Sequence, residues 1–279
     1  MATWSLCLLA WATMAAAAAA PVPVVAVTGG RVEGVRVEGV LVYKGIPYAE
    51  PPLGALRWKD PRPVRPWSGA RRADAFAPAC AQGKPPFGLA SSEDCLYLNV
   101  WTAARSARER RPVMVWIHGG GFTAGATAEP PYDGLRFAQQ GIVLVTIAYR
   151  LGAFGFLAHP ELDREIGHPS GNYGLRDMIA ALKWVRANIA AFGGDPQRVT
   201  IAGQSSGGTA VSLLATAPAA RGLFEQVIAE SGDATFRAPR YSLDAADQSG
   251  PLQTQRFGES VGKVLLHQLP GAAPRGIGQ

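Results

Sequence analysis

The sequence predicts an α/β fold in which a mostly parallel sheet is flanked by helices. Three continuous apolar runs, residues 113–117, 142–149 and 199–203, are typical of parallel strands that are covered on both faces. Between the last two runs, residues 175–189 place Leu, Met, Ile and Val at spacings of three and four, which is the pattern of a helix. A strand, a helix and a strand in this order form a parallel crossover unit.

Shorter elements are expected around this core. Residues 22–48 contain valine-rich segments separated by glycines at hairpin spacing, which predicts a small antiparallel β meander. Residues 50–92 are rich in Pro, Gly and Arg, and we expect a long loop that is packed by its aromatic side chains. The pattern then predicts a helix over 209–215, a strand over 226–231 and an amphipathic helix over 254–268.

The composition is that of a globular protein. The chain has 279 residues, of which 48% are hydrophobic and 17% are charged, so it is long and apolar enough to bury a substantial core. The net charge of +6 comes from scattered basic residues and not from a basic run. Nucleic acid is therefore not expected as a partner.

The N-terminal segment predicts export. Residues 4–20 are apolar, carry no charge and end in small residues just before Pro21, as in a secretory signal peptide. The run is short and rich in alanine, so no stable membrane span is expected, and an uncleaved anchor is the alternative. We therefore assign residues 1–20 to a signal peptide and residues 21–279 to a secreted or periplasmic domain.

Removal of the signal peptide leaves two cysteines, Cys80 and Cys95. Because oxidising compartments favour disulfides, we expect these two residues to pair and to pin the long loop. Two buried free thiols are the alternative. The chain-entropy account gives roughly 3 kcal/mol for closing a loop of about 15 residues.

Residues 203–207, Gly-Gln-Ser-Ser-Gly, have the form Gly-x-Ser-x-Gly, which presents a nucleophilic serine on a tight turn between a strand and a helix. An apolar run precedes them and small residues follow, as this turn requires. The start of the following helix places a positive dipole near a developing negative charge. Ser205 is therefore the candidate nucleophile, and an ordinary structural turn is the alternative.

A second glycine-rich segment, His-Gly-Gly-Gly-Phe at residues 118–122, follows the first apolar run directly. Successive glycines let the backbone approach a substrate and turn its N–H groups toward one point, as an oxyanion hole requires. Gly120 and Gly121, together with the N–H of Ser206, are the expected donors. A flexible loop or a phosphate cradle is the alternative, although the Gly-Lys-Ser/Thr ending of a phosphate-binding loop is absent. This chemistry needs no metal and no organic cofactor.

Six segments carry specific patterns: YKGIPYAEPPLGALRW (43–58), EDCLYLNVW (93–101), WIHGGGF (116–122), YRLGAFGFL (149–157), GNYGLRDMIAALKWVRANIAAFGGDPQRVTIAGQSSGG (171–208) and GLFEQVIAESG (222–232). Together they resemble the type B carboxylesterases, the family within the α/β-hydrolases that includes cholinesterases and bacterial para-nitrobenzyl esterases. The resemblance implies an α/β-hydrolase fold and hydrolysis of small-molecule carboxylic esters through an acyl-enzyme. It implies the same roles for the serine, the oxyanion donors and the two cysteines, and it adds a structural ion pair between Arg150 and Asp177.

The acid and the histidine of a catalytic triad are not evident in the sequence. In α/β-hydrolases they follow the serine, first the acid and then the histidine. His267 is the only histidine after Ser205, and its surroundings, KVLLHQLPG, do not resemble the catalytic-histidine segment of the family. His118, His159 and His168 precede the serine and are expected in loops. None of the later acidic residues stands out: Glu225, Glu230, Asp233, Asp244, Asp247 and Glu259.

We therefore expect the N-terminal half of a carboxylesterase domain, incomplete at its C-terminus. Absence of the later strands would leave an apolar sheet edge uncovered, which predicts poor solubility or a need for a partner. Two rival interpretations are a non-catalytic binding or adhesion module of the same fold and an inactive fragment. The intact Ser205 and the intact glycine triplet speak against a pure binding module, which needs neither.

Overall fold

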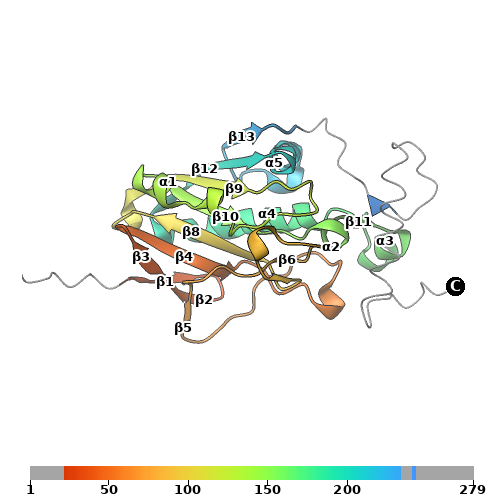
Figure 1. Cartoon of the computed structure of the whole chain (residues 1–279), viewed down its shortest axis with the longest axis horizontal. Helices are drawn as coiled ribbons and strands as arrows, with labels where there is room; N and C mark the ends of the chain where they lie inside the picture. The colour runs from red at the N-terminus through yellow and green to blue at the C-terminus, as the bar shows by residue number, and fades with distance from the viewer. Residues whose placement is uncertain (1–21, 234–240, 243–279) are drawn as a thin grey trace, which may run out of the picture.

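The computed structural model describes residues 22–233 and the backbone of residues 241–242 (Figure 1). The predicted signal peptide, the predicted helix over 254–268 and His267 lie outside the described residues. Within the described part, no helix is long and apolar enough to span a membrane.

A seven-stranded sheet forms the centre of the fold, in the order β13-β12-β9-β10-β8-β4-β3 (Figure 1). The strands from β13 to β10 pair in parallel, and the strands from β10 to β3 pair antiparallel. The parallel half contains the three predicted apolar runs, which confirms the predicted α/β class. The strands are β3 (Val35–Val37), β4 (Val40–Pro47), β8 (Tyr97–Thr102), β9 (Arg111–Ile117), β10 (Val143–Ile147), β12 (Gly194–Gln204) and β13 (Gln226–Glu230).

Helices pack on both faces of this sheet. In β9, Val113 and Ile117 face the larger core, to which α4 and α5 contribute. Met114 and Trp116 point to the opposite face, where α1 packs. Because both faces are covered, successive positions of the strand are apolar. The helices are α1 (Leu135–Gln139), α4 (Tyr173–Asn188) and α5 (Ser206–Thr216).

Helix α4 confirms the helix predicted over residues 175–189. Met178, Leu182 and Val185 lie on one face of it and are completely buried. The short helix η5 (Ile189–Phe192) follows, and Gly193 ends it with a φ of 78°. A left-handed residue at this position stops a helix, and glycine adopts that conformation without steric cost.

The N-terminal segment is antiparallel, as predicted, but it forms two hairpins in different sheets and not one continuous meander. β1 (Val24–Val27) pairs antiparallel with β2 (Gly30–Glu33), and β3 pairs antiparallel with β4. The other edge of β2 pairs with β5 (Ala70–Arg72), which gives a separate three-stranded sheet. Since that edge is occupied, β3 does not continue the hairpin and joins the central sheet instead.

Strand β8 was not predicted from the apolar pattern. It lies between β4 and β10, and the polar residue Asn99 is buried at its centre. Asn99 Nδ2 donates to Thr146 Oγ1 of β10 (2.8 Å), and Asn99 Oδ1 accepts from the N–H of Gly45 in β4 (2.9 Å). Both neighbouring strands therefore satisfy the amide, which allows a polar residue inside the sheet.

The long loop of residues 50–92 is pinned as predicted. Cys80 and Cys95 form a disulfide, which confirms the predicted pair. Trp58 is buried, and its Nε1–H donates to the carbonyl oxygen of Ala153 (2.9 Å).

Besides β5, the loop contains η1 (Gly54–Leu56), β6 (Ala79–Cys80), η2 (Pro86–Gly88) and β7 (Ser91–Ser92). Further short elements are η3 (Ala107–Glu109), η4 (Pro130–Tyr132), α2 (Gly152–Phe156), β11 (Leu157–Ala158), α3 (Pro160–Ile166), η6 (Pro218–Ala220) and β14 (Tyr241–Ser242).

A buried ion pair joins the segment after β10 to helix α4. The side chains of Arg150 and Asp177 are 3% and 0% exposed. Arg150 Nε donates to Asp177 Oδ2 (2.8 Å), Arg150 Nη2 donates to Asp177 Oδ1 (2.7 Å), and the N–H of Arg150 donates to Asp177 Oδ2 (3.1 Å). This confirms the ion pair that the resemblance implied, and each charge is neutralised by the other away from water.

Strand β13 forms one edge of the sheet in the described part of the chain. All five of its residues are exposed, and Val227 and Ile228 are 47% and 40% exposed. An exposed edge with apolar side chains favours pairing with another chain. The expected uncovered apolar edge is therefore present within residues 22–233.

Substituting Asp177→Asn should lower the free energy of unfolding by about 3–5 kcal/mol, because it leaves the buried guanidinium of Arg150 without a counter-charge. Asp74→Asn is the control, since Asp74 pairs with the exposed Arg72, and it should cost about 1 kcal/mol or less. Urea unfolding measured by circular dichroism compares the two variants. If both variants lost the same free energy of unfolding, burial of the ion pair would not explain the cost.

Substituting Ile228→Lys should reduce self-association, because a lysine on an edge strand opposes strand pairing. Phe137→Lys is the control, since Phe137 is also exposed but lies on α1. Size-exclusion chromatography with light scattering measures the monomer fraction at matched concentrations. The same gain for both variants would show that general charge, and not the edge of β13, is responsible.

Candidate active site

Ser205 lies on the turn between β12 and α5. It directly precedes α5, and its φ of 56° and ψ of −124° are disfavoured for a residue with a side chain, at a cost of about 1–3 kcal/mol. Its N–H donates to the carbonyl oxygen of Glu230 (2.8 Å), and its carbonyl oxygen accepts from the N–H of Thr209 (2.9 Å). These bonds to β13 and α5 hold the strained turn in place.

Gly207 lets the first turn of α5 approach β9. A Cβ atom at this position would lie 2.2 Å from the carbonyl oxygen of Ile117 and 3.0 Å from that of His118. No side chain fits, so the helix rests directly on the carboxyl end of β9. The last glycine of the motif therefore brings Ser205 next to the segment that follows β9.

That segment, residues 119–125, is named the glycine loop. Gly120 has a φ of 108°, and its carbonyl oxygen accepts from the N–H of Ala124 (3.0 Å), so the loop closes on itself. A Cβ atom on Gly119 would lie 3.3 Å from Ser205 Cβ. Gly120 and Gly121 are exposed beside this contact. The two predicted glycine segments are therefore brought together.

His118 and Tyr149 support the start of the glycine loop. His118 Nδ1 donates to the carbonyl oxygen of Gly119 (2.8 Å), and Tyr149 OH donates to the carbonyl oxygen of His118 (2.8 Å). The two rings stack with centroids 4.5 Å apart. Burial lowers the pKa of His118 to about 4, so the imidazole is neutral at pH 7, and burial raises the pKa of Tyr149. Both side chains therefore shape the loop as neutral groups, as expected for His118.

The hydroxyl group of Ser206 ties the glycine loop to α5. The N–H of Phe122 donates to Ser206 Oγ (3.3 Å), and the carbonyl oxygen of Phe122 accepts from the N–H of Gly152 (2.7 Å). Sequence reasoning used only the backbone N–H of Ser206 and missed this contact of its side chain, as it missed Tyr149. No local pattern signals it, because the two partners are 84 residues apart in the chain.

None of the three described histidines forms a hydrogen bond to Ser205. His159 caps α3, where its Nδ1 accepts from the N–H of Glu161 (3.1 Å). His168 Nε2 lies 3.3 Å from a carboxylate oxygen of Asp60 on the surface. Both occupy loop positions, as predicted. The candidate acids Asp244, Asp247 and Glu259 and the remaining histidine, His267, lie outside the described residues.

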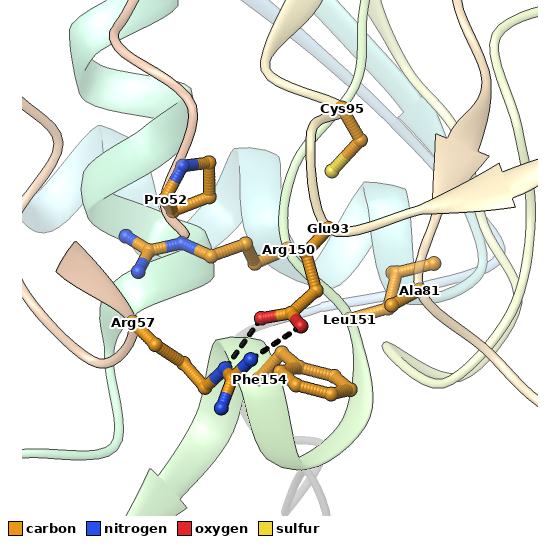
Figure 2. A pocket seen from close by; sticks show the side chains of 8 residues that line it. All are labelled: Pro52, Arg57, Ala81, Glu93, Cys95, Arg150, Leu151 and Phe154. Atoms are coloured by element: carbon orange, nitrogen blue, oxygen red, sulfur yellow. Dashed lines mark hydrogen bonds and ion pairs between the residues drawn. The ribbon is translucent and has the colours of Figure 1, made fainter. Parts of the chain in front are cut away.

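A small pocket lies beside the disulfide, and Figure 2 shows its side chains. Arg57 Nε and Nη2 donate to the carboxylate of Glu93 at 2.5 and 2.6 Å (Figure 2). Neither Ser205 nor any residue of the glycine loop lines this pocket, and its acid is already paired. It therefore offers no place for the reaction. The lining residues are Pro52, Arg57, Ala81, Glu93, Cys95, Arg150, Leu151 and Phe154.

Metal-binding side chains are not grouped in residues 22–233: no three His, Cys, Asp or Glu residues there lie close enough together to hold an ion. The chemistry available beside Ser205 is that of a hydroxyl group, backbone N–H groups and the start of a helix.

A serine on a strained strand-to-helix turn, at the carboxyl ends of parallel strands and beside a glycine loop, is the arrangement found in α/β-hydrolases. The sequence profile of the carboxylesterase family matches residues 21–252. The chain therefore belongs to the carboxylesterase family.

Similar proteins and solved structures support this membership. The chain is 47% identical over 240 residues to the fumonisin B1 esterase of Sphingopyxis macrogoltabida. This match covers 80% of this chain and 44% of that protein. It is 47% identical over 210 residues to the para-nitrobenzyl esterase of Bacillus subtilis (strain 168), with coverage of 73% and 42%. Among solved structures, a PNB esterase is 48% identical with a TM-score of 0.70 and coverage of 75% and 44%. The chain thus spans less than half the length of these relatives.

Substituting Gly120→Ala should lower the free energy of unfolding by more than about 1 kcal/mol, because alanine is strained at positive φ and its Cβ would lie 2.1 Å from the carbonyl oxygen of Ala124. Gly83→Ala is the control, since a Cβ there meets nothing within 4 Å. Thermal unfolding measures both. If Gly120→Ala unfolded at the same midpoint temperature as the wild type, the described geometry of the loop would be contradicted.

Proposed function

We propose that this chain carries the nucleophile and the oxyanion hole of a serine carboxylic ester hydrolase. The observation that carries the proposal is the contact between the strained turn at Ser205 and the glycine loop. Membership of the carboxylesterase family supports it, because named relatives of the chain are esterases.

In the proposed reaction, Ser205 Oγ attacks the carbonyl carbon of an ester and a base takes the hydroxyl proton. The N–H groups of Gly120, Gly121 and Ser206 donate to the oxyanion that forms, and each such donor contributes roughly 3–4 kcal/mol in comparable enzymes. Collapse of the intermediate breaks the C–O bond to the alcohol, which leaves with the proton that the base returns to it, and an acyl group remains on Ser205. Water then attacks the acyl carbon and gives a proton to the base. The bond to Ser205 Oγ breaks, the base returns this proton to Oγ, and the acid is released.

No histidine within residues 22–233 forms a hydrogen bond to Ser205, so no base is assigned there. A serine hydroxyl is a weak nucleophile without a base. The proposal therefore covers only the nucleophile and the oxyanion donors of this chain. It leaves the base to be supplied by a group outside the described part.

Small-molecule carboxylic esters are the proposed substrates. The proposal rests on the names of two relatives, a fumonisin B1 esterase and a para-nitrobenzyl esterase.

A non-catalytic binding module of the same fold is the second candidate. It is favoured by one observation, namely that no histidine within residues 22–233 forms a hydrogen bond to Ser205. The strain retained at Ser205 opposes it, because a binding module gains nothing from a residue held at this φ and ψ.

In the full chain, Ser205→Ala should abolish labelling by a fluorophosphonate probe and lower the hydrolysis of para-nitrophenyl acetate by more than about 10³-fold. Ser212→Ala is the matched control, because Ser212 lies on the same helix and donates only to the carbonyl oxygen of Gly208 (3.1 Å). It should retain wild-type labelling.

Gel fluorescence after probe treatment and absorbance of released para-nitrophenol provide the two measurements. Labelling that survives in Ser205→Ala would exclude Ser205 as the nucleophile. Wild-type protein that neither labels nor turns over ester would favour the non-catalytic module.

A further inference from the structure

The side chain of Gln82 binds Gly125, the last residue of the glycine loop. Gln82 lies in residues 80–95, the segment that the disulfide closes. Gln82 Nε2 donates to the carbonyl oxygen of Gly125 (2.8 Å), and the N–H of Gly125 donates to Gln82 Oε1 (3.1 Å). The side-chain amide thus pairs with both backbone groups of one residue, as a neighbouring strand would. Because the N–H can only donate and the carbonyl oxygen can only accept, these partners determine the orientation of the amide.

Gln82 is itself fixed from behind. Its Nε2 also donates to the carbonyl oxygen of Cys80 (3.0 Å), so both hydrogens of the amide nitrogen are used. Cys80 is cross-linked to Cys95, and both sulfur-bearing residues are buried. Gln82 therefore lies two residues after a cysteine that a disulfide bond holds in place.

Gly125 lies directly against the start of the glycine loop. It has a φ of 115°, and a Cβ atom on it would lie 2.4 Å from His118 Nδ1 and 2.6 Å from the carbonyl oxygen of Gly119. A shift of Gly125 would therefore move the residues that precede Gly120. The middle of the loop is held separately, through the bonds of Phe122 to Ser206 and Gly152.

We propose that Gln82 is a positioning residue that fixes the glycine loop from the disulfide-closed segment and so keeps Gly120 and Gly121 in place beside Ser205. Gln82 touches no reacting atom and acts through Gly125. The consequence for ester hydrolysis rests on the proposed function, whereas the consequence for the loop does not.

Hydrogen exchange measured by mass spectrometry tests the effect on the loop. Gln82→Met keeps the length of the side chain but removes its hydrogen bonds, and it should lower the protection of amides in residues 119–125 about tenfold. Strands β9 and β10 should keep their protection. Gln140→Met is the matched control, because Gln140 is an exposed glutamine at the end of α1, and it should match the wild type.

Gln82→Glu gives a pH-dependent test. At pH 7 its carboxylate can accept from the N–H of Gly125 but cannot donate to the carbonyl oxygen, and protonation restores a donor. Protection of the loop, relative to wild type at the same pH, should therefore recover as the pH falls from about 7 to about 4, through the range in which a glutamate titrates. Loss of packing alone would not recover with pH.

The rate of Ser205 labelling by a fluorophosphonate should fall about tenfold in Gln82→Met and stay unchanged in Gln140→Met. Wild-type loop protection in Gln82→Met, or an equal loss in β9 and β10, would overturn the proposal. If Gln82→Met does not fold, the change of loop protection with pH in Gln82→Glu tests the role of Gln82 instead. Absence of labelling in the wild type would contradict the proposed function instead, and exchange would still decide the role of Gln82.

Discussion

The first turn of α5 lies directly on the carboxyl end of β9 because no side chain separates them. Gly207 places the first turn of α5 on the carbonyl oxygens of Ile117 and His118, and the strained turn at Ser205 is thereby pressed against the glycine loop. Any side chain at position 207 would push the helix off the sheet. Pairing of β9 with β12 brings the two strand ends together, and this close contact of α5 lets the candidate nucleophile lie beside the candidate oxyanion donors.

Several buried polar groups around that contact are hydrogen-bonded to one another. The hydroxyl of Tyr149 holds the carbonyl oxygen of His118, and the next residue, Arg150, forms its ion pair with Asp177 in α4. The end of β10 is therefore connected both to the glycine loop and to the helix that precedes β12. Unpaired polar atoms are costly in such a dry environment, so this network restricts the segment after β10 to one arrangement.

The described part of the chain supplies one side of the proposed reaction site. In parallel sheets, functional groups gather at the carboxyl ends of neighbouring strands, and here β9 and β12 contribute the glycine loop and Ser205. The neighbour on the other side, β13, is an exposed edge within residues 22–233. A chain that spans less than half the length of these relatives thus holds the candidate nucleophile in place through contacts of its own.

Local patterns in the sequence determined the parallel strands, helix α4, the turn at Ser205 and the glycine loop, because each depends on residue types within a short segment. The disulfide was predictable because only two cysteines follow residue 20. Only the tertiary structure decided how the N-terminal hairpins divide between two sheets, why Asn99 is buried in β8 and how Gln82 reaches Gly125. These outcomes depend on partners far apart in the chain, 43 residues in the case of Gln82 and Gly125. A sequence pattern does not state which distant backbone group will satisfy a given side chain.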